Sequence, residues 1–154
     1  FLGLFGIIAI NWLLLSTFET LLYLNLGGLL SGTYVTALLL LLLQSAVLAA
    51  ISVLFSSFMT TSLAVVVMVG LYMIGNNLSG IQTLLGKMDA GVLKSTIAAF
   101  SYLVPNMEYF NLGFKVTYSL PISVQFGLLS LGYGLVWIVL PLYGAGKLLQ
   151  GRES

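Results

Sequence analysis

Residues 34–58 read YVTALLLLLLQSAVLAAISVLFSSF and carry no charged side chain. A membrane-spanning helix needs about 20 mostly apolar residues, because each residue adds about 1.5 Å and the hydrocarbon layer is about 30 Å thick. Residues 38–43 are six consecutive leucines, which do not alternate as the strands of a membrane barrel do. Since an unpaired backbone group in lipid costs several kcal/mol, the stretch predicts a transmembrane α-helix.

The apolar stretch continues beyond this helix, and no charge occurs between Glu19 and Lys87. As one helix, residues 34–85 would be about 78 Å long, so the chain must fold back on itself. The best place for the break is the hydroxyl-rich run at residues 56–62, whose side chains can cap the end of one helix and the start of the next. Two spans are therefore predicted, at about 34–58 and 61–85.

Two further apolar stretches complete the prediction. Residues 1–24 fit one crossing, and residues 25–33 supply glycines and a serine for a turn. Residues 123–146 fit the last crossing. The sequence therefore predicts an all-α, polytopic membrane protein, with residues 1–154 forming one transmembrane domain of four spans. Because the chain opens on Phe1 directly into apolar sequence, we expect further spans upstream.

The composition excludes several other classes of protein. Apolar residues make up 60% of the 154 residues and charged residues 6%, whereas soluble domains carry about 25% charged residues. Five Lys and Arg against four Asp and Glu give no basic patch for a nucleic acid. The chain has neither Cys nor His and no phosphate-binding loop, so it offers no usual zinc site, catalytic triad or nucleotide site of its own. We expect no enzyme activity and no metal or cofactor in this chain.

The connection at residues 86–122 holds five of the nine charges, yet it is not a polar linker. Apolar residues recur at helical spacing in residues 90–103, which predicts a short interfacial or re-entrant helix before the last span. Pro105 and Asn106 should end that helix, and Glu108 and Tyr109 follow in an aromatic run suited to headgroup depth. The segment is either a structured cap over a translocation path or a connector lying at the interface.

Three polar residues inside the predicted spans are candidates for a substrate pathway. Glu19 lies near the end of the first span, and an intramembrane carboxylate is costly to bury without a role. It is also close enough to the turn to reach headgroups. Asn76 and Asn77, in the third span, either line a pathway or hydrogen-bond between helices to stabilise the bundle.

The order of these features resembles the C-terminal two-thirds of a permease of the ATP-binding-cassette transporter type-2 family. The similar pieces, in chain order, are FLGL at residues 1–4, LFSSFMTTS at 54–62, NNLSG at 76–80 and FSYLVPNMEYFNL at 100–112. The likeness extends over nearly the whole chain. It rests on span order and on the Pro-Asn-x-Glu-Tyr-Phe segment rather than on a catalytic signature.

The resemblance implies six spans per subunit, of which these would be the third to the sixth, with cytoplasmic termini in the bacterial inner membrane. It implies an outer re-entrant segment at about 88–118, which includes Pro105, Asn106, Glu108 and Tyr109. It also implies a partner cytosolic ATPase that holds ATP and Mg, a second permease subunit, and transport that is usually export. The count of Lys and Arg next to the spans, three on the connection against two at the C-terminus, mildly favours the opposite orientation.

A second class of function fits the same composition. A small structural subunit of a multi-subunit membrane complex would also be apolar, helical and free of catalytic groups. The two hypotheses differ in their partners, because only the permease requires a subunit that binds and hydrolyses ATP. The transported molecule is not encoded in any motif of the sequence.

Overall fold

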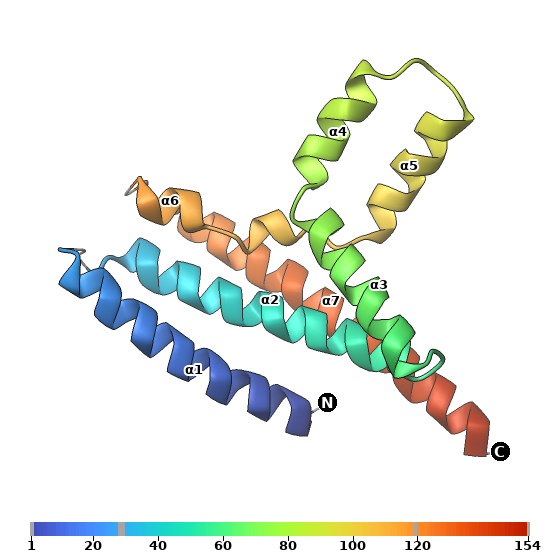
Figure 1. Cartoon of the computed structure of the whole chain (residues 1–154), viewed down its shortest axis with the longest axis horizontal. Helices are drawn as coiled ribbons and strands as arrows, with labels where there is room; N and C mark the ends of the chain where they lie inside the picture. The colour runs from blue at the N-terminus through green and yellow to red at the C-terminus, as the bar shows by residue number, and fades with distance from the viewer. Residues whose placement is uncertain (1, 28–29, 119, 154) are drawn as a thin grey trace.

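The structure is a computed structural model, and it describes residues 2–27, 30–118 and 120–153. The described residues form only helices and connections, which confirms the all-α prediction. They comprise seven α-helices and one short 3-10 helix, η1, shown in Figure 1. In chain order these are α1 (Leu2–Asn25), α2 (Gly32–Ser56), α3 (Thr61–Gly75), α4 (Leu78–Lys87), α5 (Val92–Leu103), η1 (Met107–Tyr109), α6 (Gly113–Thr117) and α7 (Val124–Glu153).

Three helices are long and apolar enough to cross a membrane, and the bent pair α3 and α4 makes a fourth crossing if it is one span. The three unbroken candidates are Gly6–Asn25, Gly32–Ser56 and Val124–Gln150. The predicted break in the long apolar stretch is confirmed, because α2 ends at Ser56 and α3 begins at Thr61. Ser57 Oγ donates to Leu54 O at 2.6 Å at the end of α2, whereas Thr60 makes no side-chain cap at the start of α3.

The predicted third span at 61–85 is not one straight helix. It breaks between Gly75 and Leu78, and α4 is bent by 68° from α3. The side-chain amides of Asn76 and Asn77 donate to the carbonyls of Tyr72 and Met73, at 3.0 and 2.8 Å, within the last turn of α3. Side chains that bond back to the backbone in this way compete with a continuing helix.

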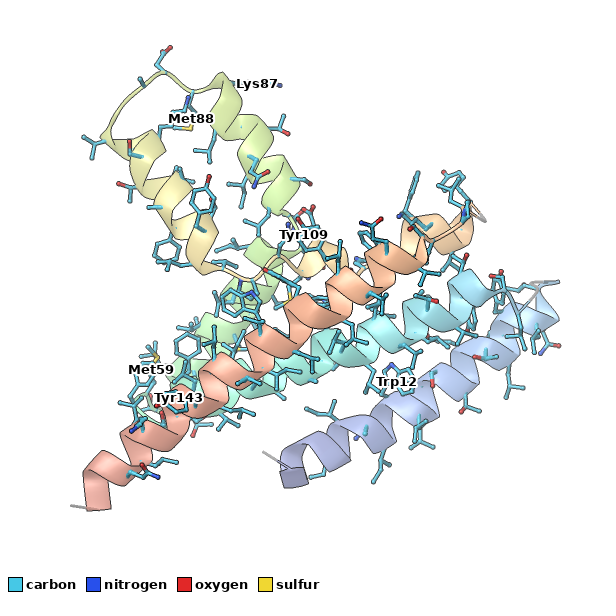
Figure 2. The ribbon with its side chains drawn as sticks, turned by 180° about the vertical axis from the view of Figure 1, so that it is seen from behind. Trp12, Met59, Lys87, Met88, Tyr109 and Tyr143 are labelled. Atoms are coloured by element: carbon cyan, nitrogen blue, oxygen red, sulfur yellow. The ribbon has the colours of Figure 1, made fainter. Side chains whose placement is uncertain are left out.

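The helices place the ends of the chain on one side of the bundle. In Figure 1 the start of α1, the α2–α3 turn and the end of α7 lie at the same end, and the α1–α2 turn and α6 lie at the other. The hairpin of α4 and α5 projects away from the bundle beyond α3. Figure 2 shows Lys87 and Met88 at the tip of this hairpin, far from Met59 and Tyr143 at the opposite end. This is the arrangement expected of four crossings.

The core is built on α2, which packs along α7. Gly134 permits a close approach, because a Cβ atom there would lie 2.7 Å from Leu43 Cδ2 of α2. Small residues at such a contact are the usual means by which membrane helices pack tightly. The core cluster combines residues of α2 with three from the connection before α7: Ala37, Leu40, Val47, Ile51, Met107, Phe110 and Leu112.

Helix α1 joins the bundle near the α1–α2 turn. The ring of Tyr23 stacks on that of Tyr34, with centroids 4.8 Å apart, and the hydroxyls of Thr20 and Tyr34 lie 2.9 Å apart. Within the apolar window of α1, only 6% of the residues are buried. The rest of this helix is therefore free to contact lipid or another subunit.

Candidate functional site

Residues 104–112, here called the return segment, lead from α5 back to the bundle. Pro105, Met107 and Phe110 are fully buried, and Val104 and Leu112 are nearly so. The connection is thus anchored by its own apolar side chains, which is more than a loose interfacial connector requires. The backbone N–H and C=O groups of a buried loop need hydrogen-bond partners. In the return segment, the polar side chains between the buried residues provide some of these partners.

Pro105 and Asn106 turn the chain at the end of α5. The helix ends at Leu103, as predicted from the proline. The backbone N–H of Asn106 donates to Tyr133 Oη of α7 at 2.7 Å. Asn106 Oδ1 accepts from the N–H of Glu108 at 3.0 Å and so caps η1. The first bond ties the return segment to α7, and the second, which lies within the segment, fixes the backbone at Glu108.

Glu108 connects the return segment to the helical hairpin. Its Oε1 accepts from the backbone N–H of Ser79 at 2.9 Å and from Ser79 Oγ at 2.8 Å. Ser79 lies in the first turn of α4, where Asn77, the N-cap residue, makes no side-chain cap bond. The first N–H groups of a helix need acceptors, and the helix dipole favours a negative charge there. Glu108 therefore caps α4 from 29 residues away.

Gly75 brings the end of α3 against the return segment. A Cβ atom at Gly75 would lie 2.7 Å from both Met107 Cγ and Pro105 O. The missing side chain leaves the space that Met107 occupies. The bend after α3, the return segment and the cap on α4 therefore meet at one place.

Asn76 and Asn77 lie in this bend, whereas Glu19 does not. Asn76 Oδ1 also accepts from Gln44 Nε2 of α2 at 3.5 Å. Glu19 is exposed on α1, and its carboxylate makes no hydrogen bond with the described part of the chain. In Figure 1 α2 separates α1 from α3, so the three predicted pathway residues do not form one cluster.

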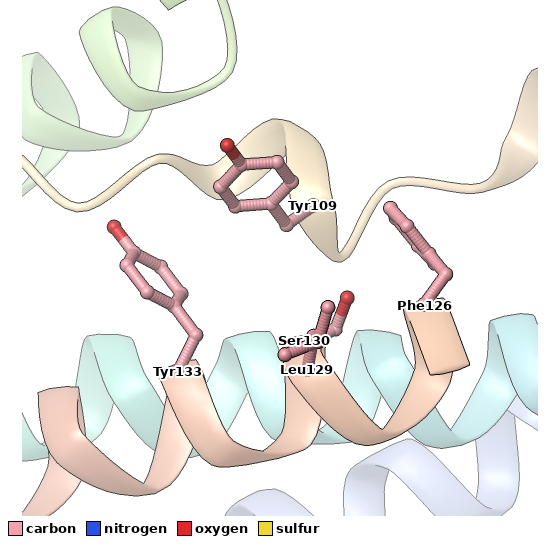
Figure 3. Close-up of a pocket in the computed structure, with 5 residues that line it drawn as sticks. All are labelled: Tyr109, Phe126, Leu129, Ser130 and Tyr133. Atoms are coloured by element: carbon pink, nitrogen blue, oxygen red, sulfur yellow. The ribbon is translucent and has the colours of Figure 1, made fainter. Parts of the chain in front are cut away.

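Tyr109 covers a cavity of about 380 Å³ between η1 and α7. Its ring meets Phe126 and Tyr133 edge to face, with centroids 6.4 and 5.5 Å apart. Leu129 and Ser130 complete the lining, as Figure 3 shows. The wall is therefore mostly aromatic and apolar, with one hydroxyl.

Four residues of the site were not singled out for these roles from the sequence: Gly75, Ser79, Ser130 and Tyr133. A glycine directly before two asparagines, Gly75, was an available signal for a close contact at a bend. Ser130 belongs with Gly127 and Gly134 to a small-residue face of the last span, which indicates packing and not a cavity. No local pattern connects Ser79 with Glu108.

The polar side chains of the site hold neighbouring helices in position. Within the described residues no group of three or more His, Cys, Asp or Glu side chains is close enough to hold a metal ion. The carboxylate of Glu108 is engaged by Ser79, and Asn76 and Asn77 bond to the backbone. The arrangement holds helices and a cavity in place.

No family model, curated protein or solved structure matches this chain.

Proposed function

We propose that the chain is a membrane-spanning permease subunit of an ATP-binding-cassette transporter of the type-2 family. It forms part of a translocation path and performs no covalent chemistry. A separate cytosolic ATPase, loaded with ATP and Mg, supplies the energy, and a second permease subunit completes the path. The transport is export across the bacterial inner membrane.

The observation that carries this proposal is the construction of residues 75–112. A span that bends by 68°, a helical hairpin and a buried return segment follow one another and are locked together by Glu108 and Gly75. The motifs NNLSG and VPNMEYFNL, which belong to the family resemblance, contain Ser79 and Glu108, and Gly75 directly precedes the first of them. An interface-lying connector has no need of fully buried Met107 and Phe110.

The sparse burial of α1 supports a subunit that works within an assembly. Its exposed side chains are apolar on several faces, as the consecutive residues Leu13, Leu14 and Leu15 show. Lipid or a partner helix can cover such a surface. In a transporter built from several spans, α1 would contact both. The same helix would be covered in the same way in a structural subunit of another membrane complex. The identity of the partner subunits therefore distinguishes the two functions.

The test is purification of the native assembly in mild detergent, with identification of every subunit. The proposal expects a stoichiometric partner with a phosphate-binding loop, and loss of export when the catalytic glutamate or the loop lysine of that partner is replaced. Stoichiometric partners without any nucleotide site, in an assembly whose function persists without ATP, would establish the structural subunit instead.

A further inference from the structure

The cavity beneath Tyr109 has the size and lining of a ligand site. Its volume of about 380 Å³ lies within the range of roughly 300–1,000 Å³ that is usual for small-molecule pockets. Leu129, on its wall, is 66% exposed, so the cavity borders the outer surface of α7. In a membrane that surface faces lipid or a neighbouring helix, and an apolar body is the natural occupant.

Ser130 gives the cavity one unused polar group. The residue is only 4% exposed, and its hydroxyl makes no hydrogen bond with any described residue. The other three buried polar side chains, Ser16, Gln44 and Ser57, are all hydrogen-bonded within the chain. Figure 3 shows the hydroxyl of Ser130 directed toward the space under Tyr109. No described side-chain polar atom is both fully buried and without a partner, so the Ser130 oxygen is accessible from the cavity. A hydroxyl can donate one hydrogen bond and accept others, and a polar atom of a ligand in the cavity would be its partner.

Lys115 gives the same place an unpaired positive charge. Its Nζ lies 4.5 Å from the centroid of Phe126, which lines the cavity, and it has no ion pair among the described residues. Lys115 lies in α6, between Phe114 and Tyr118 and shortly before α7 begins. Aromatic and lysine side chains at the end of a span are typical of headgroup depth.

We propose that this cavity binds an anionic phospholipid of the membrane. One acyl chain lies against Phe126 and Leu129, an ester carbonyl accepts from Ser130 Oγ, and the phosphate lies beside Lys115 Nζ. A partner helix of apolar residues would fill the space but would leave both the hydroxyl and the ammonium group unsatisfied. This site requires only that α7 crosses a membrane, and it does not depend on the transporter function.

The experiment is native mass spectrometry of the full-length protein in detergent. It is titrated with phosphatidylglycerol or phosphatidylcholine of identical acyl chains, and the occupancy of the first bound lipid is compared. One lysine close to an anionic headgroup predicts about fivefold tighter binding of phosphatidylglycerol. Lys115→Gln should abolish this preference, and Ser130→Leu, which fills the cavity, should weaken binding of both lipids.

Lys147 supplies the matched control, because its Nζ lies 5.8 Å over the ring of Tyr143 at the far end of α7. Lys147→Gln should leave the preference unchanged. If Ser130→Leu does not fold, Ser130→Ala removes only the hydroxyl and should still lower phosphatidylglycerol binding severalfold. Equal binding of the two lipids by the unmodified protein, or a preference that survives Lys115→Gln, overturns the proposal. So does a protein that binds neither lipid at this site because a second copy covers Phe126 and Leu129.

Discussion

At the scale of single residues, Glu108 has the clearest assignable energetic role. Its carboxylate accepts two hydrogen bonds from Ser79 at the N-terminus of α4. The negative charge of the carboxylate, its two hydrogen bonds and the dipole of α4 therefore all stabilise the first turn of α4. The consequence is local, because the residue holds the hairpin of α4 and α5 at its angle to the bundle.

Replacement of Glu108 tests this role. Glu108→Ala should lower the free energy of unfolding by about 1–2 kcal/mol, since the first turn of α4 loses its acceptor. Glu108→Gln keeps an acceptor oxygen and should cost about 0.5 kcal/mol. Denaturant unfolding in detergent measures both, and amide exchange in α4 should rise with the loss. Asp89→Asn, an exposed carboxylate in the same hairpin, is the matched control. Equal effects of Glu108→Ala and Asp89→Asn would refute the capping role.

Gly75 is the second residue whose identity the structure requires. Gly75→Ala should lower the free energy of unfolding by about 1–3 kcal/mol, because the new Cβ would lie 2.7 Å from Met107 Cγ and Pro105 O. The backbone oxygen cannot move away as a flexible side chain can. Gly70→Ala in the same helix meets open space and should be neutral or mildly stabilising. The same unfolding measurement compares the two, and a harmless Gly75→Ala would mean that the return segment does not pack on α3.

At the scale of elements, the pairing of α2 with α7 holds the bundle together. The two helices approach at Gly134, and no side chain stands there between the backbone of α7 and Leu43. Without a hydrophobic driving force between helices in lipid, such packing supplies much of the association energy. The contact therefore sets the spacing on which the core around Met107 and Phe110 depends.

Two glycines two residues apart on α7 test this pairing. Gly134→Ala should lower the free energy of unfolding by about 1–2 kcal/mol, since Leu43 must shift to make room. Gly132→Ala has no atom within 4 Å of the new Cβ and should not destabilise the protein. Thermal unfolding in detergent, followed by circular dichroism, compares the variants. If Gly132→Ala were the more harmful change, α7 would present a different face to α2.

The bend in the third span shows where sequence reasoning ends. The spans, α5 and the stop at Pro105 followed from length, charge-free composition and helical spacing, which are local properties. The separation of α3 from α4 depends on Gly75 against Met107 and on Glu108 against Ser79. The partners in these pairs are about 30 residues apart along the chain, and no pattern of neighbouring residues records their contact.

The candidate site was predictable to a similar degree. Pro105, Asn106, Glu108 and Tyr109 were singled out together, and because they are near neighbours in the chain their common place on the return segment follows from the sequence itself. Their partners Ser79 and Tyr133 were not, because a hydrogen bond between segments leaves no trace in either one. Glu19 was predicted as a pathway residue because a carboxylate is costly to bury in lipid. It is exposed on α1, however, and does not form a cluster with Asn76.

At the scale of the whole molecule, we infer that the chain crosses the membrane four times, with the bent pair α3 and α4 as one of the crossings. The α3 helix alone has 15 residues, about 22 Å, which is too short for the hydrocarbon layer. The bent pair must therefore act as one crossing for the hairpin and the C-terminus to lie on opposite faces. The proposed transport path depends on this topology.

The most direct test uses the absence of cysteine from the sequence. Single substitutions Asp89→Cys, Thr60→Cys and Gln150→Cys are labelled with a membrane-impermeant maleimide in right-side-out and inverted vesicles. Four crossings predict that Asp89→Cys reacts from one face only, and that Thr60→Cys and Gln150→Cys react only from the other. Reaction of Asp89→Cys and Thr60→Cys from the same face would contradict the account, because the bent pair would then not cross the membrane.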